Sequence, residues 1–389
     1  MPDRAINENL SLEPLRIIPV TDSRLMQSFI ELPWSLYAED PCWIPPLIIE
    51  RKWHLSPKNP YFKHAEFQAW IAFRGERMVG RISAQVDQLY LQRYQNATGF
   101  FGFLEAEDNA ETFHALFNVA EDWLLQQGMQ RILGPFNLSI NDELGLLVDG
   151  FEIPPPIMLG HALPYYGPRV EEQGYAKERD LMAYLVDPAV PPPRHLEVLT
   201  KRAADRVVVR SMRRDHFQED LKIIRDIYED AWSENWGFVP FTSEEFAELG
   251  KNLKLLVPSE SVRIAEIDGE PAAMMVVFPN LNEAIKDLNG RLLPFGWLKL
   301  LWRLKVAGVK SARVPLMGVR RRYQGSRLGA TLAFMVIAPL HERAREQGMK
   351  SVDMSWILEE NQGMRKIIES VGSLLYKRYR IYQKDLSEG

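Results

Sequence analysis

The sequence contains a single cysteine, Cys42, and seven histidines that are scattered along the chain. One thiol cannot form an internal disulfide, and these residues do not make up a zinc cage. We therefore expect a protein of a reducing compartment that binds no metal. Long apolar runs are also missing: no stretch of about 18 uncharged apolar residues occurs, and the polar residues 1–9 lack the apolar core of a signal peptide. These absences predict a cytoplasmic protein.

An excess of positive charge is absent as well. The chain has 47 lysines and arginines against 52 aspartates and glutamates, which gives a formal net charge of -5. Because no global basic field exists, we expect no nucleic-acid partner. The hydrophobic share of 46% and the charged share of 25% are those of a folded globular protein. At 389 residues the chain is long enough for two domains.

A proline-dense stretch, Asp187-Pro-Ala-Val-Pro-Pro-Pro-Arg194, lies near the middle of the chain. Such a stretch cannot be a helix or a central strand and is typical of a stiff, extended linker. We therefore predict an N-terminal lobe over residues 1–186, a linker over 187–205 and a C-terminal domain over 206–389.

The two halves contain similar segments in the same order. Residues 71–80 and 264–273 both have the pattern of strand, turn and strand, and Gly128 ends one predicted helix as Gly348 ends another. These matches predict a duplication. The spacing between matching segments is longer in the second half, which predicts an insertion before its long helix.

Hydrophobic periodicity predicts an α+β fold with mixed sheets, because strands and helices do not alternate strictly. Thr242 and Glu245 have the spacing of a capping box and mark one helix start. In the second half we predict strands at 206–211, 262–267, 272–278, 312–319, 352–357 and 374–383, and helices at 217–231, from 242, at 329–347 and at 361–370. In the first half we predict strands at 68–73, 78–87 and 99–104 and a helix at 112–127.

A glycine-containing turn, Gln324-Gly-Ser-Arg-Leu-Gly329, lies between an apolar strand and a long helix. Glycines leave backbone N–H groups uncovered, and a helix N-terminus adds partial positive charge, so this turn can hold a pyrophosphate. Arg320, Arg321, Arg322 and Arg327 would attract phosphate and would otherwise stand idle. The alternative is a glycine turn beside a solvated arginine run. Neither a Rossmann nor a P-loop pattern is present.

This turn resembles the signature of the GNAT superfamily of acyl-CoA-dependent N-acyltransferases, Gln/Arg-x-x-Gly-x-Gly/Ala after the fourth strand, with Arg327 at the first signature glycine. The family's later pattern, Asn-x-x-Ala-x-x-Leu-Tyr-Glu-x-x-Gly, is matched in spacing from Asn361 to Gly372. Ile368 stands where many members have a tyrosine that reprotonates the CoA thiolate. The resemblance covers residues 207–385. It implies two GNAT-like lobes, of which the N-terminal one is degenerate because it lacks the turn.

The resemblance implies that acyl-CoA is a co-substrate and that the strands diverge beside residues 316–319 and 353–357, exposing N–H groups to the thioester and pantetheine. An amine nucleophile also needs a base. The candidates are Glu234, Asp353 and Glu359, with Glu360 beside it, and the sequence does not separate them. The residues expected to hold acyl-CoA are Met317, Val319, Arg322, Gln324, Gly325, Ser326, Arg327, Leu328, Gly329, Ala330 and Asn361.

The loop over residues 231–240 is rich in both aromatic and polar side chains. In GNAT-like proteins this loop shapes the acceptor pocket, so we expect substrate contacts from Asn235 and Trp236; packing in the core is the alternative. In the first half, Asn137 and Tyr165 belong to a second polar and aromatic cluster that would line the same cleft. His161 is either a base or, as we favour, a hydrogen-bonded core histidine.

In residues 292–305, large apolar and indole side chains alternate with Lys299, Arg303 and Lys305. This composition is typical of a helix that lies on a membrane surface, and its apolar stretch is too short to span a bilayer. The alternative is a lid or dimer helix packed on the protein itself. The membrane interpretation predicts a peripheral protein on the inner face of the membrane, with a lipidic amine or a long acyl chain as substrate.

Residues 32–37, 40–46 and 376–382 resemble a tandem-lobe bacterial group of GNAT proteins that includes bacterial ceramide synthase. The resemblance implies transfer of a fatty acyl chain from CoA to the amino group of a sphingoid base. One alternative is an acyl-CoA-binding regulatory protein that has lost catalysis, which Ile368 permits. Another is an aminoacyl-tRNA-dependent transferase of the peptidoglycan type, for which the sequence shows no basic face or coiled coil.

Overall fold

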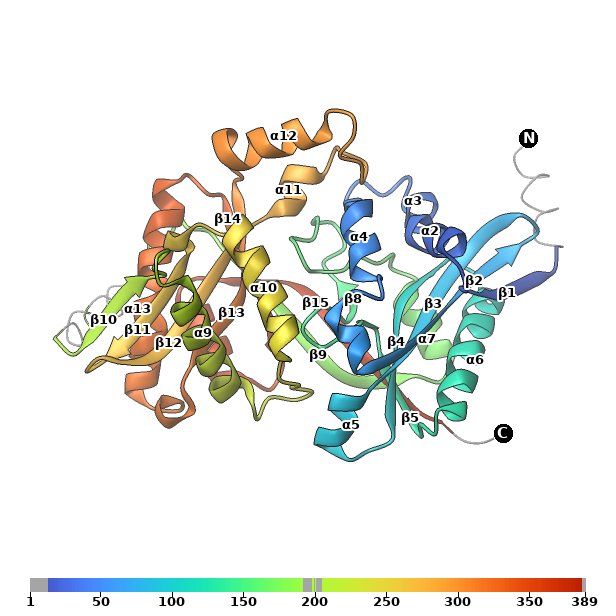
Figure 1. Ribbon diagram of the computed structural model, residues 1–389, viewed down its shortest axis with the longest axis horizontal. Helices are drawn as coiled ribbons and strands as arrows, with labels where there is room; N and C mark the ends of the chain where they lie inside the picture. Colours follow the sequence, from blue (N-terminus) through green and yellow to red (C-terminus); the bar gives the residue numbers. More distant parts are fainter. Residues whose placement is uncertain (1–12, 192–197, 199, 201–204, 387–389) are drawn as a thin grey trace. The chain divides into compact units, whose positions relative to one another are not determined.

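The computed structural model describes residues 13–191, 198, 200 and 205–386. The chain divides into two compact units (Figure 1). Unit 1 combines the chain up to Asp180 with Ile285–Pro294 and the chain from Tyr379 onward. Unit 2 combines Leu181–Ala284 with Phe295–Arg378. Each unit has its own set of paired strands and its own hydrophobic core.

The sheet of unit 1 is antiparallel except for one parallel pair, β4 with β5. Helix α6 (Ala110–Gln126) packs against β3, and its N-cap Asn109 accepts hydrogen bonds from two backbone N–H groups of the first turn. The strands in spatial order are β1 (Leu15–Pro19), β2 (Ala65–Arg74), β3 (Arg77–Asp87), β4 (Thr98–Ala106), β5 (Arg131–Gly134) and the C-terminal part of β15 (Leu374–Asp385).

Shorter elements complete unit 1. The helices are α2 (Ser23–Glu31), α3 (Pro33–Leu36), α4 (Ile48–His54), α5 (Gln88–Tyr94) and α7 (Tyr166–Glu172), with a 3-10 turn at Pro60–Lys63. The strands are β6 (Phe136–Asn137), β7 (Glu143–Leu144), β8 (Leu146–Asp149) and the first part of β9 (Ala176–Val186).

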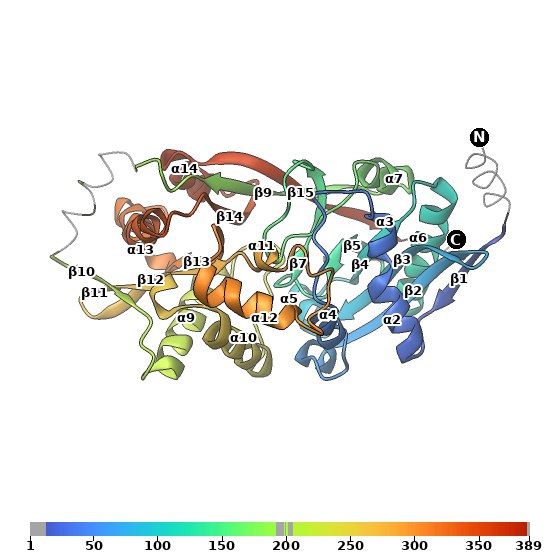
Figure 2. The same ribbon diagram turned by 90° about the horizontal axis from the view of Figure 1, so that it is seen from above.

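The sheet of unit 2 repeats this design, again with a single parallel pair, β13 with β14. Helices α9 (Phe217–Trp232) and α10 (Ser243–Leu256) cover one face, and α13 (Arg327–Glu346) and α14 (Gln362–Ser370) cover the other (Figure 2). The strands in spatial order are β10 (Val207–Ser211), β11 (Val262–Ile267), β12 (Glu270–Pro279), β13 (Ser311–Val319), β14 (Ser351–Leu358) and the second part of β9.

The predicted capping box of α10 is present. Thr242 Oγ1 accepts a hydrogen bond from Glu245 N at 3.2 Å, and Glu245 Oε2 accepts one from Thr242 N at 2.7 Å. Both donors would otherwise be unpaired at the helix start. On the other face of the sheet, the apolar side of α13 provides the largest share of the core of unit 2, including Leu332, Ala333 and Val336, which are all fully buried.

The predicted duplication is confirmed by element order: β2, β3, β4, α6 and β5 correspond to β11, β12, β13, α13 and β14. The predicted insertion is α11 (Leu281–Ile285), α12 (Gly296–Trp302) and a π-helical turn at Arg303–Ala307, all between β12 and β13. The corresponding place between β3 and β4 holds only α5.

The compact units differ from the predicted halves of the chain. The N-terminal half supplies the last strand of unit 2, and the C-terminal half supplies the last strand of unit 1. Residues 181–186 of β9 pair with β14 in unit 2, and residues 382–385 of β15 pair with β5 in unit 1. The predicted linker begins as a turn in which Val190 N donates to Asp187 O at 3.1 Å. Most of the remainder, residues 192–197, 199 and 201–204, lies outside the described residues.

Candidate functional site

The central feature of unit 2 is the place where its two parallel strands diverge. Pairing between β13 and β14 is confined to Ser311–Val314 and Ser351–Met354. Beyond these pairs β13 continues to Val319 and β14 to Leu358 without pairing to each other. The predicted divergence is therefore confirmed, and we call the open segments, residues 315–319 and 355–358, the divergence. It leaves an edge of each strand available to a ligand.

Met317 lies within the divergence. Its carbonyl oxygen accepts a hydrogen bond from the Trp232 indole N–H at 3.0 Å, so this edge of β13 faces a side chain of α9 there. In an extended strand the N–H and C=O of one residue point to the same edge. The Met317 N–H therefore points to the open side, as expected for a residue that would hold the thioester.

The glycine turn leads from β13 into α13. Ser326 is the N-cap, and its Oγ accepts a hydrogen bond from Gly329 N at 3.0 Å. Within the described part of the chain, the backbone N–H groups of Arg327 and Leu328 have no hydrogen-bond partner, as expected in the first turn of a helix. Two adjacent donors at a 20-residue helix are thus exposed to an anion.

Two glycines are needed in this turn for different reasons. Gly325 has a φ of 68°, a left-handed conformation that most side chains disfavour, and space around it is open. Gly329 is buried, and a Cβ there would collide with the backbone carbonyl of Tyr323. Gln324 closes the turn, because its Nε2 donates to Val319 O at 2.8 Å and to Ala231 O at 3.2 Å.

The expectation that the four arginines would stand idle without phosphate is wrong for three of them. The guanidinium of Arg320 pairs with Asp226. Arg321 donates to Glu234 at 2.5 Å, and Arg322 donates to Glu270 at 2.7 Å. Surface carboxylates from α9, from the loop after it and from β12 thus already neutralise these cations. Arg327 is exposed and has no ion pair among the described residues.

Three further expected acyl-CoA residues have structural roles here. Asn361 is the N-cap of α14 and accepts a hydrogen bond from Met364 N at 3.1 Å. Val319 is buried in the core, and Ala330 N donates to Ser326 O at 3.2 Å in the first turn of α13. Ile368 is fully buried, so the position of the family's tyrosine cannot donate a proton.

A buried polar cluster lies where the pairing of β13 and β14 ends. Asp353 is 2% exposed, and its Oδ2 accepts a 2.7 Å hydrogen bond from the Tyr376 hydroxyl. Ser355 Oγ donates to Oδ1, and Arg313 Nε lies 3.5 Å from the same atom. The Arg313 guanidinium also lies 4.8 Å from the centre of the Trp356 ring. All five residues belong to unit 2.

Burial raises the pKa of the Asp353 carboxyl above its usual range, and the attraction of Arg313 and the hydrogen bonds from Ser355 and Tyr376 offset only part of that effect. A carboxyl with a raised pKa is a better proton acceptor than an ordinary surface aspartate. Asp353 therefore differs from the other two candidate bases in its surroundings.

Glu234 and Glu359 lie in more exposed settings. The Glu234 side chain is 79% exposed and pairs with Arg321. Glu359 follows β14, is half-buried, and its carbonyl oxygen accepts a hydrogen bond from Arg365 at 3.0 Å. Asp353 is among the residues predicted from the sequence, whereas Arg313 and Tyr376 are not. For Arg313 the available signal is a charged residue inside an otherwise apolar strand; β15 gives no such signal for Tyr376, because it contains several charged residues.

The predicted acceptor loop divides into two parts. Phe238 and Val239 are buried, and the Phe238 ring centre lies 5.5 Å from that of Tyr228, so this part packs in the core. Asn235 and Trp236 remain half-buried at the end of α9, next to Trp232. Core packing thus holds for Phe238 and Val239, whereas substrate contacts from Asn235 and Trp236 stay a prediction.

In unit 1 the corresponding divergence is filled by the protein's own chain. β4 pairs with β5 only over Thr98–Phe100, and the Asn137 side chain accepts a 2.7 Å hydrogen bond from Phe103 N beyond that point. A Cβ at Gly102 would collide with the Phe136 carbonyl, which shows how closely β6 lies against β4. Asn137 thus occupies a backbone donor of β4 beyond the end of this parallel pair.

The turn before α6 is acidic instead of glycine-rich, with Glu107, Asp108 and Asn109 in sequence. Such a turn repels phosphate. Tyr165 donates to Ala106 O at 2.7 Å, so its hydroxyl is used within the fold. The His161 ring lies 2.8 Å from Asp40 in a buried pair, which matches the core histidine that we favoured.

The inserted helix α12 has no buried residue. Seven large apolar side chains between positions 293 and 306 are exposed. They are Leu293, Phe295, Trp297, Leu298, Leu301, Trp302 and Val306. Lys299 and Lys305 are exposed among them, whereas the Arg303 guanidinium turns inward and donates to Ala284 O at 2.7 Å. In the described ranges we find no helix that meets the length and apolarity needed to cross a bilayer.

Comparison with known proteins gives two full-length relatives, although no family model matches the chain. The chain is 49% identical over 364 residues to Protein YghO of Escherichia coli (strain K12), and the alignment covers 93% of both chains. It is 48% identical over 389 residues to the bacterial ceramide synthase of Caulobacter vibrioides (strain NA1000 / CB15N), covering 99% of this chain and 100% of the other. The chain belongs to the bacterial ceramide synthase family.

Solved structures show the fold of this member of the bacterial ceramide synthase family. A tandem GNAT protein from the clavulanic acid biosynthesis pathway matches with a TM-score of 0.55 at 13% identity, over 97% of this chain and 100% of the other. A GCN5-related N-acetyltransferase from Sphaerobacter thermophilus matches at 0.53 and 12% identity, over 97% and 98%. The predicted fold of two GNAT-like lobes is confirmed, and the chain is an acyltransferase by family.

Proposed function

We propose that the protein transfers an acyl group from acyl-CoA to an amine, and that the favoured acceptor is a lipidic amine such as a sphingoid base. The observation that carries the proposal is the coexistence, in unit 2, of a glycine turn with free N–H groups and an open pair of strands. A relative described as a bacterial ceramide synthase aligns over its full length with this chain and supports the choice of acceptor.

The turn before α13 supports the use of CoA. The N–H groups of Arg327 and Leu328 and the charge of Arg327 are suited to a pyrophosphate. Gly325 leaves room above the turn, and Gly329 lets the backbone fold closely enough to aim the donors. Arg322 lies beside the turn but is already paired with Glu270, so we expect a smaller contribution from it.

The divergence supports the chemistry of acyl transfer. The Met317 N–H on the open edge of β13 can donate to the thioester carbonyl as negative charge develops on its oxygen. The amine attacks the carbonyl carbon, the C–N bond forms, and the C–S bond breaks. The amine proton passes to Asp353, which burial makes a stronger base than usual. The CoA thiolate takes its proton from water, because buried Ile368 has none to give.

The helix α12 supports a lipidic substrate. We propose that α12 and the turn after it lie on an anionic membrane surface, with Trp297 and Trp302 in the interface and Lys299 and Lys305 toward lipid headgroups. A substrate with a long chain is dissolved in that surface, so a protein bound there meets it at high local concentration.

Release of free CoA thiol in the presence of palmitoyl-CoA and sphinganine tests the function. We expect thiol release that depends on both substrates, and an N-acylated product by mass spectrometry. Polyamines serve as the comparison amines and should support much slower release. Binding of CoA without turnover for any amine would instead identify an acyl-CoA-binding regulatory protein.

A further inference from the structure

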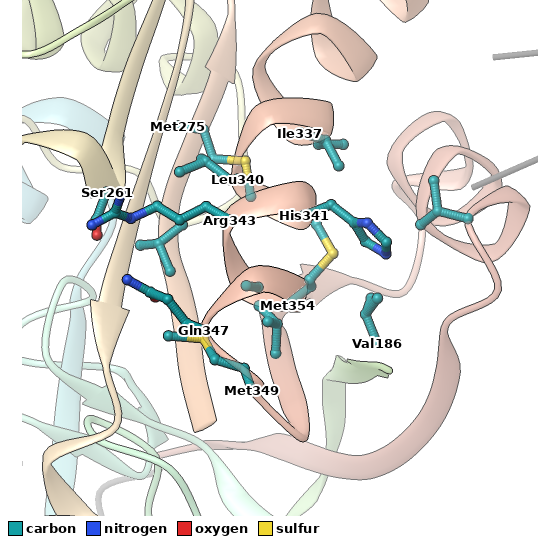
Figure 3. A pocket seen from close by; sticks show the side chains of 14 residues that line it. Val186, Ser261, Met275, Ile337, Leu340, His341, Arg343, Gln347, Met349 and Met354 are labelled. Atoms are coloured by element: carbon teal, nitrogen blue, oxygen red, sulfur yellow. The ribbon is translucent and has the colours of Figure 1, made fainter. Parts of the chain in front are cut away.

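Unit 2 contains an apolar pocket on the α13 face of its sheet, away from the glycine turn (Figure 3). Its walls come from the C-terminal half of α13, from β9, β12 and β14, and from the end of α14. Met275, Val277, Leu340, Ala344, Met349 and Met354 are among the lining residues. Protein interiors are normally packed without such space.

The pocket has the apolar lining of a hydrocarbon site, but it is narrow. Its cavity volume is about 50 Å³, whereas sites for drug-sized ligands measure about 300–1,000 Å³. A hydrocarbon chain would therefore have to widen it. The three methionines have flexible, polarisable side chains that can move to widen the narrow part.

Four of the 14 lining residues are polar: Ser261, His341, Arg343 and Gln347. Figure 3 shows the Arg343 side chain extending toward Ser261 on one side and the His341 ring on the other. Burial lowers the pKa of His341, with a further contribution from the nearby charge of Arg345, so the ring is neutral at pH 7. The other ten lining residues are methionines and aliphatic residues.

The pocket is placed in line with the proposed acyl-CoA site. The glycine turn lies at the start of α13, and Ala344 lies on the same helix about 24 Å further along, at about 1.5 Å per residue. Met354 is the last residue of β14 that pairs with β13, and Met275 pairs with Met317 of the divergence. The inner end of the pocket therefore reaches the level at which the strands separate.

Neighbouring residues of β14 point to opposite faces of the sheet. Met354 lines the pocket on the α13 face, so the adjacent Asp353 points to the other face. A thioester held between the separated strands would thus have its acyl chain on one face and the base, with the incoming amine, on the other. The chain would not block the approach of the amine.

We propose that this pocket holds the hydrocarbon chain of a long-chain acyl-CoA and so sets the acyl chain length. The inference rests on the proposed function, because it takes the thioester as the ligand of the divergence. Each buried methylene is worth about 0.8 kcal/mol, which corresponds to about fourfold in affinity.

Ala344→Leu tests the proposal by filling the pocket from a helix position that is 5% exposed. The matched control is Ala338→Leu, the same change at an exposed position of the same helix. We expect A344L to lower kcat/KM for palmitoyl-CoA at least tenfold and to change kcat/KM for butanoyl-CoA by less than twofold. The optimal acyl chain length should become shorter. A338L should keep the wild-type profile. An unchanged chain-length profile in A344L overturns the proposal.

Calorimetric binding of CoA and palmitoyl-CoA separates this inference from the proposed function. We expect wild type to bind palmitoyl-CoA more tightly than CoA, and A344L to lose that difference. If no amine is acylated, but palmitoyl-CoA binds more tightly than CoA and A344L removes this difference, the pocket assignment is supported and the proposed function is wrong. If amines are acylated but palmitoyl-CoA binds no more tightly than CoA, the pocket assignment is wrong. Thermal unfolding of both variants confirms that they fold.

Discussion

The Tyr376 hydroxyl donates a 2.7 Å hydrogen bond to Oδ2 of Asp353, at the point where β13 and β14 stop pairing. The hydrogen bond stabilises the ionised carboxylate and lowers its pKa, although burial, the larger effect, keeps the pKa above the usual range. The pair thus places a carboxyl group with a raised pKa beside the open strands. If this group is the base, the proposed mechanism has a measurable pH dependence.

Removing the hydrogen bond between Tyr376 and Asp353 should shift the dependence of kcat/KM on pH. Asp353 must be ionised to accept a proton, so kcat/KM should rise with pH as the carboxyl loses its proton. In Tyr376→Phe the carboxylate loses a stabilising donor, its pKa rises further, and the acidic limb should shift to higher pH. Asp353→Asn should lower kcat/KM about 100-fold or more at pH values above the acidic limb of wild type. An acidic limb that stays in place in Y376F would exclude Asp353 as the base, and Tyr382→Phe is the matched control.

The glycine turn is tested by a pair of variants that differ in charge and not in shape. Asn and Asp both tolerate the left-handed conformation of Gly325 better than other residues do. Gly325→Asp places a carboxylate beside the proposed pyrophosphate, whereas Gly325→Asn does not. We expect the Kd for CoA to be at least tenfold weaker in G325D than in G325N, by calorimetry at low salt. Equal affinities in the two variants would show that the turn binds no anion.

The arginines beside the turn should contribute unequally. Arg327 has no ion pair among the described residues, while Arg322 is held by Glu270 at 2.7 Å. Arg327→Ala should therefore weaken CoA binding about tenfold, and Arg322→Ala by less than about threefold. The effect of R327A should shrink as salt is added. A larger loss in R322A than in R327A would contradict the proposed assignment.

Attachment to membranes is tested by changing tryptophans and lysines separately. Trp297→Ser with Trp302→Ser should reduce binding to vesicles that contain an anionic phospholipid, at both low and high salt. Lys299→Gln and Lys305→Gln should each reduce binding about fivefold at low salt only, corresponding to about 1 kcal/mol per cation. Val208→Ser, which changes an apolar residue that is 62% exposed outside this segment, is the control. If the tryptophan changes leave vesicle binding unchanged, the membrane interpretation is wrong and α12 is better explained as a lid or dimer helix.

A buried ion pair in α9 predicts the acid stability of unit 2. The fully buried Asp220 side chain is held by Arg210 at 2.8 Å and Arg213 at 2.7 Å. Burial opposes its ionisation, but hydrogen bonds from Arg213 and Arg210 outweigh burial and lower its pKa to about 2. Because the folded pKa lies below the unfolded value of about 3.9, this stability is present above pH 4 and is lost as the pH falls toward 2.

Asp220→Asn should therefore lower the free energy of unfolding by about 3 kcal/mol at pH 7 and by much less at pH 2. Asp226 lies on the same helix, is 66% exposed, and pairs with Arg320. Asp226→Asn should cost less than about 1 kcal/mol. Urea denaturation at both pH values measures the two differences. A D220N penalty that does not shrink in acid would contradict the pKa assignment.

Much of the architecture was predictable because it depends on local patterns. Hydrophobic periodicity located β11, β12, α13 and β14, and the spacing of Thr242 and Glu245 fixed a helix start that the structure confirms. The glycine turn was predictable for the same reason, since residues adjacent in sequence form the whole of it.

The exchange of final strands was not predictable from local patterns. The sequences of β9 and β15 do not specify which strand each will pair with; in the structure β9 pairs with β14 and β15 pairs with β5. Sheet pairing is a nonlocal choice that depends on which edges remain open once the rest of the sheet has formed. The same holds for the ion pairs of Arg320, Arg321 and Arg322, whose carboxylate partners come from distant elements.

The sequence by itself determined the element order, the duplication and the glycine turn, because each depends on residues that are neighbours in the sequence. Only the tertiary structure decided which carboxylate is buried beside the separated strands and which lobe keeps its strands open. Asp353 and Glu234 look alike as sequence, but burial and the hydroxyl of Tyr376 set one apart. Likewise, Asn137 fills the gap in unit 1 only because folding brings it to Phe103. Electrostatics and packing act across space, so they appear only when distant segments meet.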